Sequence, residues 1–160
     1  MQTSLFHFPF KALGSACVVQ LYACNKTQAQ HIANLVIADV LRIEHKYSRY
    51  REDSVLTAIN KVAEQGGCIQ VDEETVALLN YADTCFQQSE GLFDISSGVL
   101  REVWDFKSEV IPKQKQIKAV LSRIGWDKVI LAGDSLSFSE KGMQLDFGGI
   151  GKEYAVDRAA

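Results

Sequence analysis

The chemistry that this sequence could perform depends on three segments, of which two contain several glycines and one combines aromatic with basic residues. The last one reads Asp146-Phe147-Gly148-Gly149-Ile150-Gly151-Lys152. Neither standard phosphate motif fits, because a Walker A loop needs glycine at Asp146 and a dinucleotide fingerprint needs glycine at Tyr154. An extended segment, a flexible turn and the start of a helix nevertheless form a suitable cradle for a pyrophosphate. The alternative is a tight turn in which glycines let a helix approach a sheet.

The second segment, Gly91-Leu92-Phe93-Asp94-Ile95-Ser96-Ser97-Gly98, has no clean helical or strand period. Irregular loops between helices often carry binding or catalytic groups. The alternative is a capped turn, in which Asp94 or Ser97 accepts hydrogen bonds from backbone N–H groups of the next helix.

The third segment is the connector Tyr47-Ser48-Arg49-Tyr50-Arg51-Glu52-Asp53-Ser54. Tyr50 could stack on a planar ring, and Arg49 or Arg51 could bind phosphate. The alternative is an exposed linker whose Asp53-Ser54 caps the next helix.

The elements that must position these segments follow from periodicity and from capping residues. We expect strands at Ser15–Cys24, Cys68–Val71, Val129–Leu131, Leu136–Phe138 and Gln144–Phe147. We expect helices from Gln28 to Lys46, from Asp53 or Ser54 to Gly66, from Asp72 to Gly91, from Pro112 to Gly125, and over the last residues to Ala160. Because strands and helices mix without a regular repeat, the pattern favours an α+β fold with a mixed or antiparallel sheet and packed helices.

The composition of the chain excludes several classes of function. The 160 residues are 47% hydrophobic, which is enough for one globular core, and the net charge of −3 is spread over the chain. No basic footprint for nucleic acid is present. No apolar run approaches the roughly 20 residues that span a bilayer, and the first residues do not resemble a signal peptide. We therefore expect a cytoplasmic protein whose four cysteines are buried, reduced thiols.

Taken in order, the three segments resemble the FAD:protein FMN transferase family, also called the ApbE family. The resemblance runs over Tyr47–Tyr50, Asp53–Leu56 and Asn60, over Gly91–Asp94 with Gly98, Leu100 and Trp104, and over Leu145–Lys152 with Tyr154–Asp157. Leu13-Gly14-Ser15 resembles the Met-Gly-Thr that precedes the first strand of the family.

The resemblance implies an enzyme that binds FAD with Mg²⁺. A Thr or Ser hydroxyl of an acceptor protein attacks the FMN phosphorus and AMP leaves, so catalysis is largely positioning and charge neutralisation. Two alternatives are a hydrolase that splits FAD into FMN and AMP, and a flavin-binding module without catalysis.

The resemblance also implies site residues. The positions that match FAD contacts are Leu13, Tyr50, Leu92, Phe93, Asp94, Lys152 and Arg158. Ala155 matches a metal position, to which it would contribute its backbone carbonyl. Glu153 stands where the family usually has glycine. No catalytic residue is identified.

The family is about twice as long as this chain, and its other metal ligands belong to a C-terminal half. We expect residues 1–160 to form a single FAD-binding N-terminal portion of a larger domain, inactive alone as a transferase. The helical pattern that runs to Ala159-Ala160 without a cap supports this expectation. Pairing with a C-terminal half, or self-association, would then complete the fold.

Overall fold

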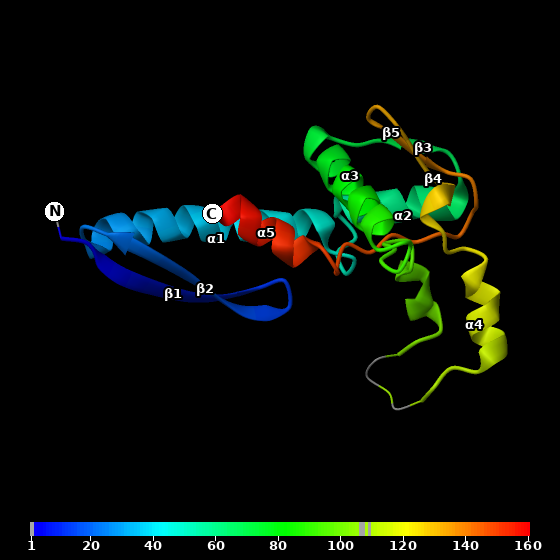
Figure 1. Ribbon diagram of the computed structural model, residues 1–160, viewed down its shortest axis with the longest axis horizontal. Helices are drawn as coiled ribbons and strands as arrows, with labels where there is room; N and C mark the ends of the chain where they lie inside the picture. Colours follow the sequence, from blue (N-terminus) through cyan, green and yellow to red (C-terminus); the bar gives the residue numbers. More distant parts are fainter. Residues whose placement is uncertain (1, 106–107, 109) are drawn as a thin grey trace. The chain divides into compact units, whose positions relative to one another are not determined.

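The computed structural model describes residues 2–105, 108 and 110–160, which divide into two compact units (Figure 1). The first unit contains the residues up to Ser48 together with Ile150–Ala160. The second unit contains Arg49–Gly149. Helices and small antiparallel sheets occur in both, which confirms the predicted α+β class.

The first unit begins with a hairpin of strands β1 (Ser4–Ala12) and β2 (Ser15–Ala23). The strands are antiparallel, and Ala12 pairs with Ser15, so Leu13 and Gly14 form the turn. Phe6, Phe8 and Phe10 alternate with exposed residues, as expected for a strand with one half-buried face. β2 was predicted, whereas β1 was missed.

Helix α1 (Lys26–Tyr47) packs against this hairpin. It begins after Asn25, whose side chain accepts a hydrogen bond from the Gln28 N–H at 2.9 Å. Its buried face carries small residues early and larger ones later, namely Ala29, Ala33, Val40, Ile43 and Tyr47. Helix α5 (Gly151–Ala159) packs on α1 through the buried Ala155. Both predicted helices are confirmed.

Two capped helices form the centre of the second unit. Helix α2 (Val55–Gln65) follows Ser54, whose hydroxyl accepts from the Thr57 N–H at 3.0 Å. Helix α3 (Glu73–Gln88) follows Asp72, whose carboxylate accepts from the Thr75 N–H at 2.9 Å. Both predicted caps are confirmed. Residues from both helices are fully buried, including Leu56, Ile59, Leu78 and Leu79.

A small antiparallel sheet completes the second unit. Its order is β3 (Cys68–Gln70), β5 (Ser135–Phe138), β4 (Val129–Ala132). The predicted hairpin around Gly133-Asp134 is confirmed, because Ala132 pairs with Ser135.

Short helices link the remaining parts. They are the 3₁₀ helix η1 (Gly98–Glu102), α4 (Gln114–Leu121) and the 3₁₀ helix η2 (Trp126–Lys128). Helix α4 starts two residues after the predicted Pro112, because the Gln116 side chain accepts from the Lys113 N–H and fixes the first turn there.

Two predictions fail. Gln144–Phe147 is not a strand: it makes one isolated bridge, between Ser97 and Gln144, and the Asn60 side chain binds the Leu145 backbone. The cysteines are not buried either, since Cys24 and Cys68 are exposed while Cys17 and Cys85 are half-buried, and all four are free. Within the described part of the chain, no helix has both the length and the apolar composition needed to cross a membrane.

Candidate functional site

Asp146 joins two of the three predicted segments within the second unit. Its Oδ2 accepts a hydrogen bond from Arg49 Nη1 at 2.6 Å and lies 3.3 Å from Arg101 Nε. Its Oδ1 accepts from the Gly148 N–H at 2.8 Å. The side chains of Arg49 and Asp146 are only 20% and 18% exposed. One carboxylate therefore fixes the connector, the helix η1 and the glycine turn together.

Asn60, on α2, makes a second link to the part of the chain that carries Asp146. Its Nδ2 donates to the Leu145 carbonyl at 3.0 Å, and its Oδ1 accepts from the Leu145 N–H at 2.8 Å. Leu145 is fully buried. The Asp146 N–H donates to the Ile95 carbonyl at 2.8 Å. The segment is thus held extended by a side-chain amide and by a loop carbonyl, which explains why it forms no regular strand.

Asp94 stabilises the loop between α3 and η1 through hydrogen bonds. Its Oδ1 accepts from the Ser96 N–H at 2.7 Å, and its Oδ2 accepts from the Trp126 N–H at 3.1 Å. The Ser96 hydroxyl accepts from the Gly125 N–H at 2.8 Å. Asp94 therefore holds a turn, but the N–H groups that it binds belong to Ser96 and Trp126 and not to the next helix, η1, as the capped-turn alternative had it. Each carboxylate oxygen can accept a further hydrogen bond, so a contact from Asp94 to a nucleotide stays a prediction.

A cavity of about 330 Å³ lies among these groups. Its lining includes Leu92, Phe93, Asp94, Arg101 and Asp146, together with the glycine turn. Ligand pockets begin at about this volume. The cavity could therefore hold one ring system or a phosphate group of a dinucleotide.

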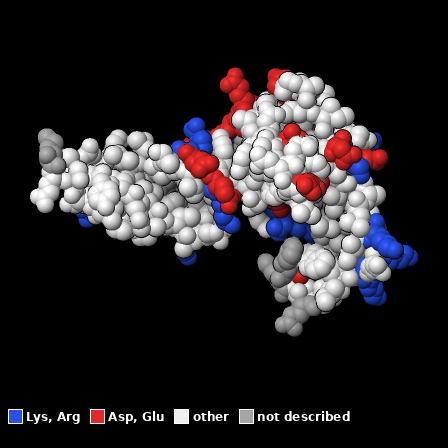
Figure 2. Space-filling model, viewed as in Figure 1, with Lys and Arg blue, Asp and Glu red and all other residues white. Residues whose placement is uncertain are grey.

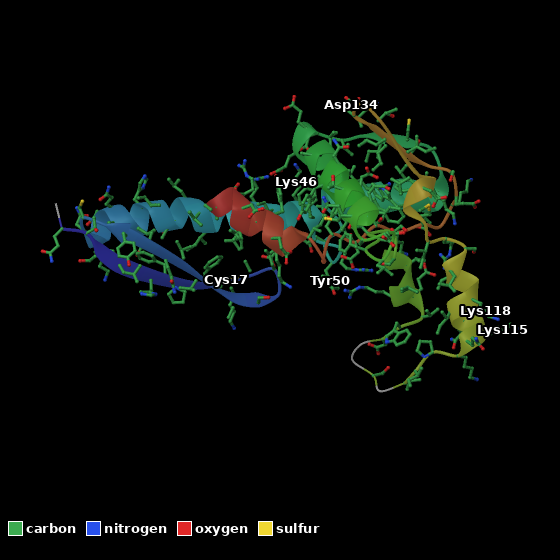
Figure 3. The ribbon with its side chains drawn as sticks, in the orientation of Figure 1. Cys17, Lys46, Tyr50, Lys115, Lys118 and Asp134 are labelled. Carbon is green, nitrogen blue, oxygen red and sulfur yellow. The ribbon has the colours of Figure 1, made fainter. Side chains whose placement is uncertain are left out.

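Two exposed side chains belong to the same region. Leu92, on the cavity wall, is 92% exposed. Tyr50, labelled in Figure 3, is 81% exposed, and its hydroxyl accepts from Arg101 Nη1 at 3.2 Å. Because Arg101 also lines the cavity, Tyr50 lies beside it. An aromatic ring and an apolar side chain held in solvent are suited to cover a planar ligand.

The remaining predicted residues belong to the first unit. Leu13 lies in the hairpin turn, Lys152 is exposed in the first turn of α5, and Arg158 Nε lies 3.6 Å from Asp39 Oδ2 on α1. Ala155 is buried within α5. Their contacts with FAD stay predictions.

The described residues do not fit a magnesium site. They contain no group of three or more His, Cys, Asp or Glu side chains that could hold a metal ion. Mg²⁺ prefers near-octahedral oxygen coordination, which one carbonyl cannot supply. Inside an α-helix, moreover, the carbonyl of Ala155 faces the N–H four residues on. The metal role of Ala155 stays a prediction, and no reaction step is assigned to a metal here.

The sequence prediction gave no role to Arg101, Asp146 or Asn60. Of the two arginines suggested as phosphate ligands, Arg49 binds Asp146 and Arg51 binds the exposed Asp53. Helix η1 is further fixed by Arg123, which donates two hydrogen bonds to Glu102, and this bonding raises the pKa of the Arg123 guanidinium. In the view of Figure 2, acidic and basic side chains both occur on the second unit, so no single-sign patch dominates that face.

Gly98 is required by a close backbone approach. A Cβ at this position would lie 2.8 Å from the Gln144 carbonyl oxygen and 3.2 Å from Asp146 Cβ. We expect Gly98→Ala to lower the free energy of unfolding by about 1–3 kcal/mol, since the backbone would have to shift. Urea denaturation measures this. Gly151→Ala is the matched control, because its Cβ would meet nothing within 4 Å; an equal loss in both variants would contradict the packing argument.

Comparison with known structures places this architecture in a class of solved enzymes. The ApbE protein of Thermotoga maritima is 29% identical, with a TM-score of 0.85 over 98% of this chain and 51% of its own. The flavinyl transferase ApbE of Pseudomonas stutzeri shares the fold, with a TM-score of 0.87 over 99% of this chain and 54% of its own, at 24% identity.

The chain belongs to the ApbE family, whose sequence model matches residues 13–160. A curated relative from Treponema pallidum, named FAD:protein FMN transferase, is 28% identical over 156 residues, which are 91% of this chain and 43% of the relative. A second relative of the same name, from Klebsiella pneumoniae, is 26% identical over 150 residues and is covered to 46%. The family is thus one of transferase enzymes, and the chain spans less than half the length of these relatives.

Proposed function

We propose that this protein binds FAD and transfers its FMN part to a hydroxyl group of an acceptor protein. The observation that carries the proposal is the convergence of family segments on Asp146 and Asn60, beside a cavity with an exposed aromatic ring. The names of the relatives support the same activity.

In the proposed reaction, the oxygen of a Thr or Ser hydroxyl forms a bond to the FMN phosphorus. The bond from that phosphorus to the bridging oxygen breaks, AMP leaves with that oxygen, and the hydroxyl proton passes to a base. The chain's own contribution is binding and orientation. Within the second unit, Tyr50, Leu92 and Phe93 would contact the flavin nucleotide.

A flavin-binding module without catalysis is the second candidate. A hydrolase that releases FMN and AMP without an acceptor is a variant of the first candidate.

Titration of the purified protein with FAD, with and without Mg²⁺, tests these candidates when flavin fluorescence and AMP release are followed together. AMP release that requires a Thr-containing acceptor peptide would support transfer, whereas AMP release without a peptide would indicate hydrolysis. Binding without AMP would support the binding module. Absence of any FAD binding would contradict the proposal for this chain.

Tyr50→Ala should weaken FAD affinity by about 3- to 10-fold, because an aromatic contact of this kind is worth about 0.5–1.5 kcal/mol. Fluorescence titration measures the change, and Tyr50→Phe, which keeps the ring, should retain most of the affinity. The matched control is Tyr22→Ala, which removes a similarly exposed ring from β2. Equal affinities for the Tyr50→Ala protein and the unmodified protein would remove Tyr50 from the proposed site.

A further inference from the structure

Arg101 brings a positive charge to the cavity of about 330 Å³ in the second unit. It belongs to the helix η1, and its side chain is 41% exposed. Among the described residues that line this cavity, Arg101 is the only cation, and Asp94 and Asp146 are the acids. Asp94 accepts hydrogen bonds from the N–H groups of Ser96 and Trp126, which offset part of its charge. An anionic group that enters the cavity would therefore meet the Arg101 guanidinium.

Two contacts orient this guanidinium. Its Nε lies 3.3 Å from Asp146 Oδ2, and its Nη1 donates to the Tyr50 hydroxyl at 3.2 Å. Asp146 is also bound by Arg49, at the shorter distance of 2.6 Å. Because two arginines share one carboxylate, Asp146 orients Arg101 more than it neutralises its charge. An arginine that is already oriented loses less side-chain entropy when it binds a ligand.

The glycine turn adds backbone donors to the same wall. Gly148 and Gly149 both line the cavity. The Gly148 N–H donates to Asp146 Oδ1, whereas the Gly149 N–H makes no hydrogen bond within the described part of the chain. A Cβ at Gly149 would lie 2.7 Å from the Phe93 ring, so glycine is needed where this ring meets the backbone. A guanidinium and exposed backbone N–H groups are donors that proteins use to bind phosphate.

We propose that Arg101 binds a phosphate group of the flavin nucleotide in this cavity. The inference rests on the proposed function, because that function supplies the flavin nucleotide as the ligand. The planar guanidinium can donate to two phosphate oxygens at once, and its charge favours FMN and FAD over uncharged riboflavin. Arg101 would therefore determine that the site takes a phosphorylated flavin.

Comparison of FMN with riboflavin tests this role, because the two ligands differ only in the phosphate. Fluorescence titration of the unmodified protein, without added metal, should give a higher affinity for FMN, and this preference should decrease as the ionic strength rises. In Arg101→Gln, FMN affinity should fall about tenfold while riboflavin affinity stays within about twofold, as expected for the loss of a hydrogen bond to a charged group. Arg101→Lys should lie in between, because it keeps the charge but not the planar donors.

Two matched controls separate the charge of Arg101 from its contacts within the protein. Tyr50→Phe removes the hydrogen bond between Tyr50 and Arg101 and should keep the preference for FMN. Arg51→Gln removes an arginine that pairs with the exposed Asp53 and does not line the cavity, and it should also keep the preference. Equal losses of FMN and riboflavin affinity in Arg101→Gln would indicate a structural role only and would overturn the inference, as would unchanged FMN affinity.

The inference and the proposed function can fail separately. If the unmodified protein binds riboflavin and FMN equally well, flavin binding stands and the role of Arg101 is overturned. If it binds neither of them nor FAD, the proposed function is refuted, and titration with inorganic pyrophosphate decides whether Arg101 binds anions. The NMR signal of the Arg101 Nε–H group should then shift and saturate, whereas an unchanged signal would overturn the anion site as well.

Discussion

Replacing Asn60 with alanine should lower the free energy of unfolding by about 2–4 kcal/mol, one of the two largest effects that we expect. The substitution removes both hydrogen bonds to the Leu145 backbone. Leu145 is fully buried, so its N–H and carbonyl would lose their partners where water cannot easily replace them. Urea denaturation followed by circular dichroism measures the loss.

Two further variants separate this effect from a general effect of removing asparagine. Asn60→Asp keeps an acceptor for the Leu145 N–H but lacks the donor for the carbonyl. Asn34→Ala removes an exposed side chain on α1 that accepts a hydrogen bond from Gln30, and it should change stability by less than about 0.5 kcal/mol. Similar losses for Asn34→Ala and Asn60→Ala would contradict the role given to Asn60.

Asp146→Ala should reduce both stability and FAD affinity. Arg49 is largely buried and would lose its carboxylate partner, so we expect a loss of about 2–3 kcal/mol in the free energy of unfolding. The same change removes the hydrogen bond from the Gly148 N–H and the ion pair with Arg101. Arg101 also donates a hydrogen bond to the Tyr50 hydroxyl, so Tyr50 would be less well fixed. With the glycine turn and Tyr50 both less fixed, FAD affinity should fall by about tenfold or more.

Stability is measured by denaturation and affinity by flavin fluorescence below the unfolding transition, so that the two effects are separated. Asp146→Asn should keep the bond from Gly148 while losing the charge, and should lie between Asp146→Ala and the unmodified protein. Asp53→Ala is the matched control, because its pair with Arg51 is exposed and solvent screens it. Unchanged FAD affinity in Asp146→Ala would show that this carboxylate does not organise the binding site.

The local part of the fold could be predicted from the sequence. Asn25, Ser54 and Asp72 mark helix starts because their side chains bind backbone N–H groups only three residues on. The Gly133-Asp134 hairpin follows from turn chemistry in the same way. The family resemblance likewise depends on short segments, each of which can be recognised from its own residues.

The contacts that assemble the site could not be predicted in this way. Asn60 and Leu145 are 85 positions apart, and Arg49 and Asp146 are 97 positions apart, so no periodicity links them. The same long-range bonds explain why the strand predicted at Gln144–Phe147 does not form. Its apolar residues alternate as in a strand, but the Asn60 side-chain amide binds the backbone of Leu145 in place of a neighbouring strand. For β1 a local signal did exist, since Phe6, Phe8 and Phe10 have a period of two.

The separation between Asn60 and Leu145 also has a consequence for the synthesis of the protein. Helix α2 leaves the ribosome long before the segment whose backbone its asparagine binds, and loop closure over 85 positions must precede that contact. The cavity walls therefore cannot assemble on a nascent chain until residues near Gly149 have emerged. Folding of the second unit should accordingly be slower than helix formation alone, because its decisive contacts are non-local. A ribosome-bound chain that ends before Leu145 should contain α2 and α3 but not the cavity lined by Asp94 and Asp146.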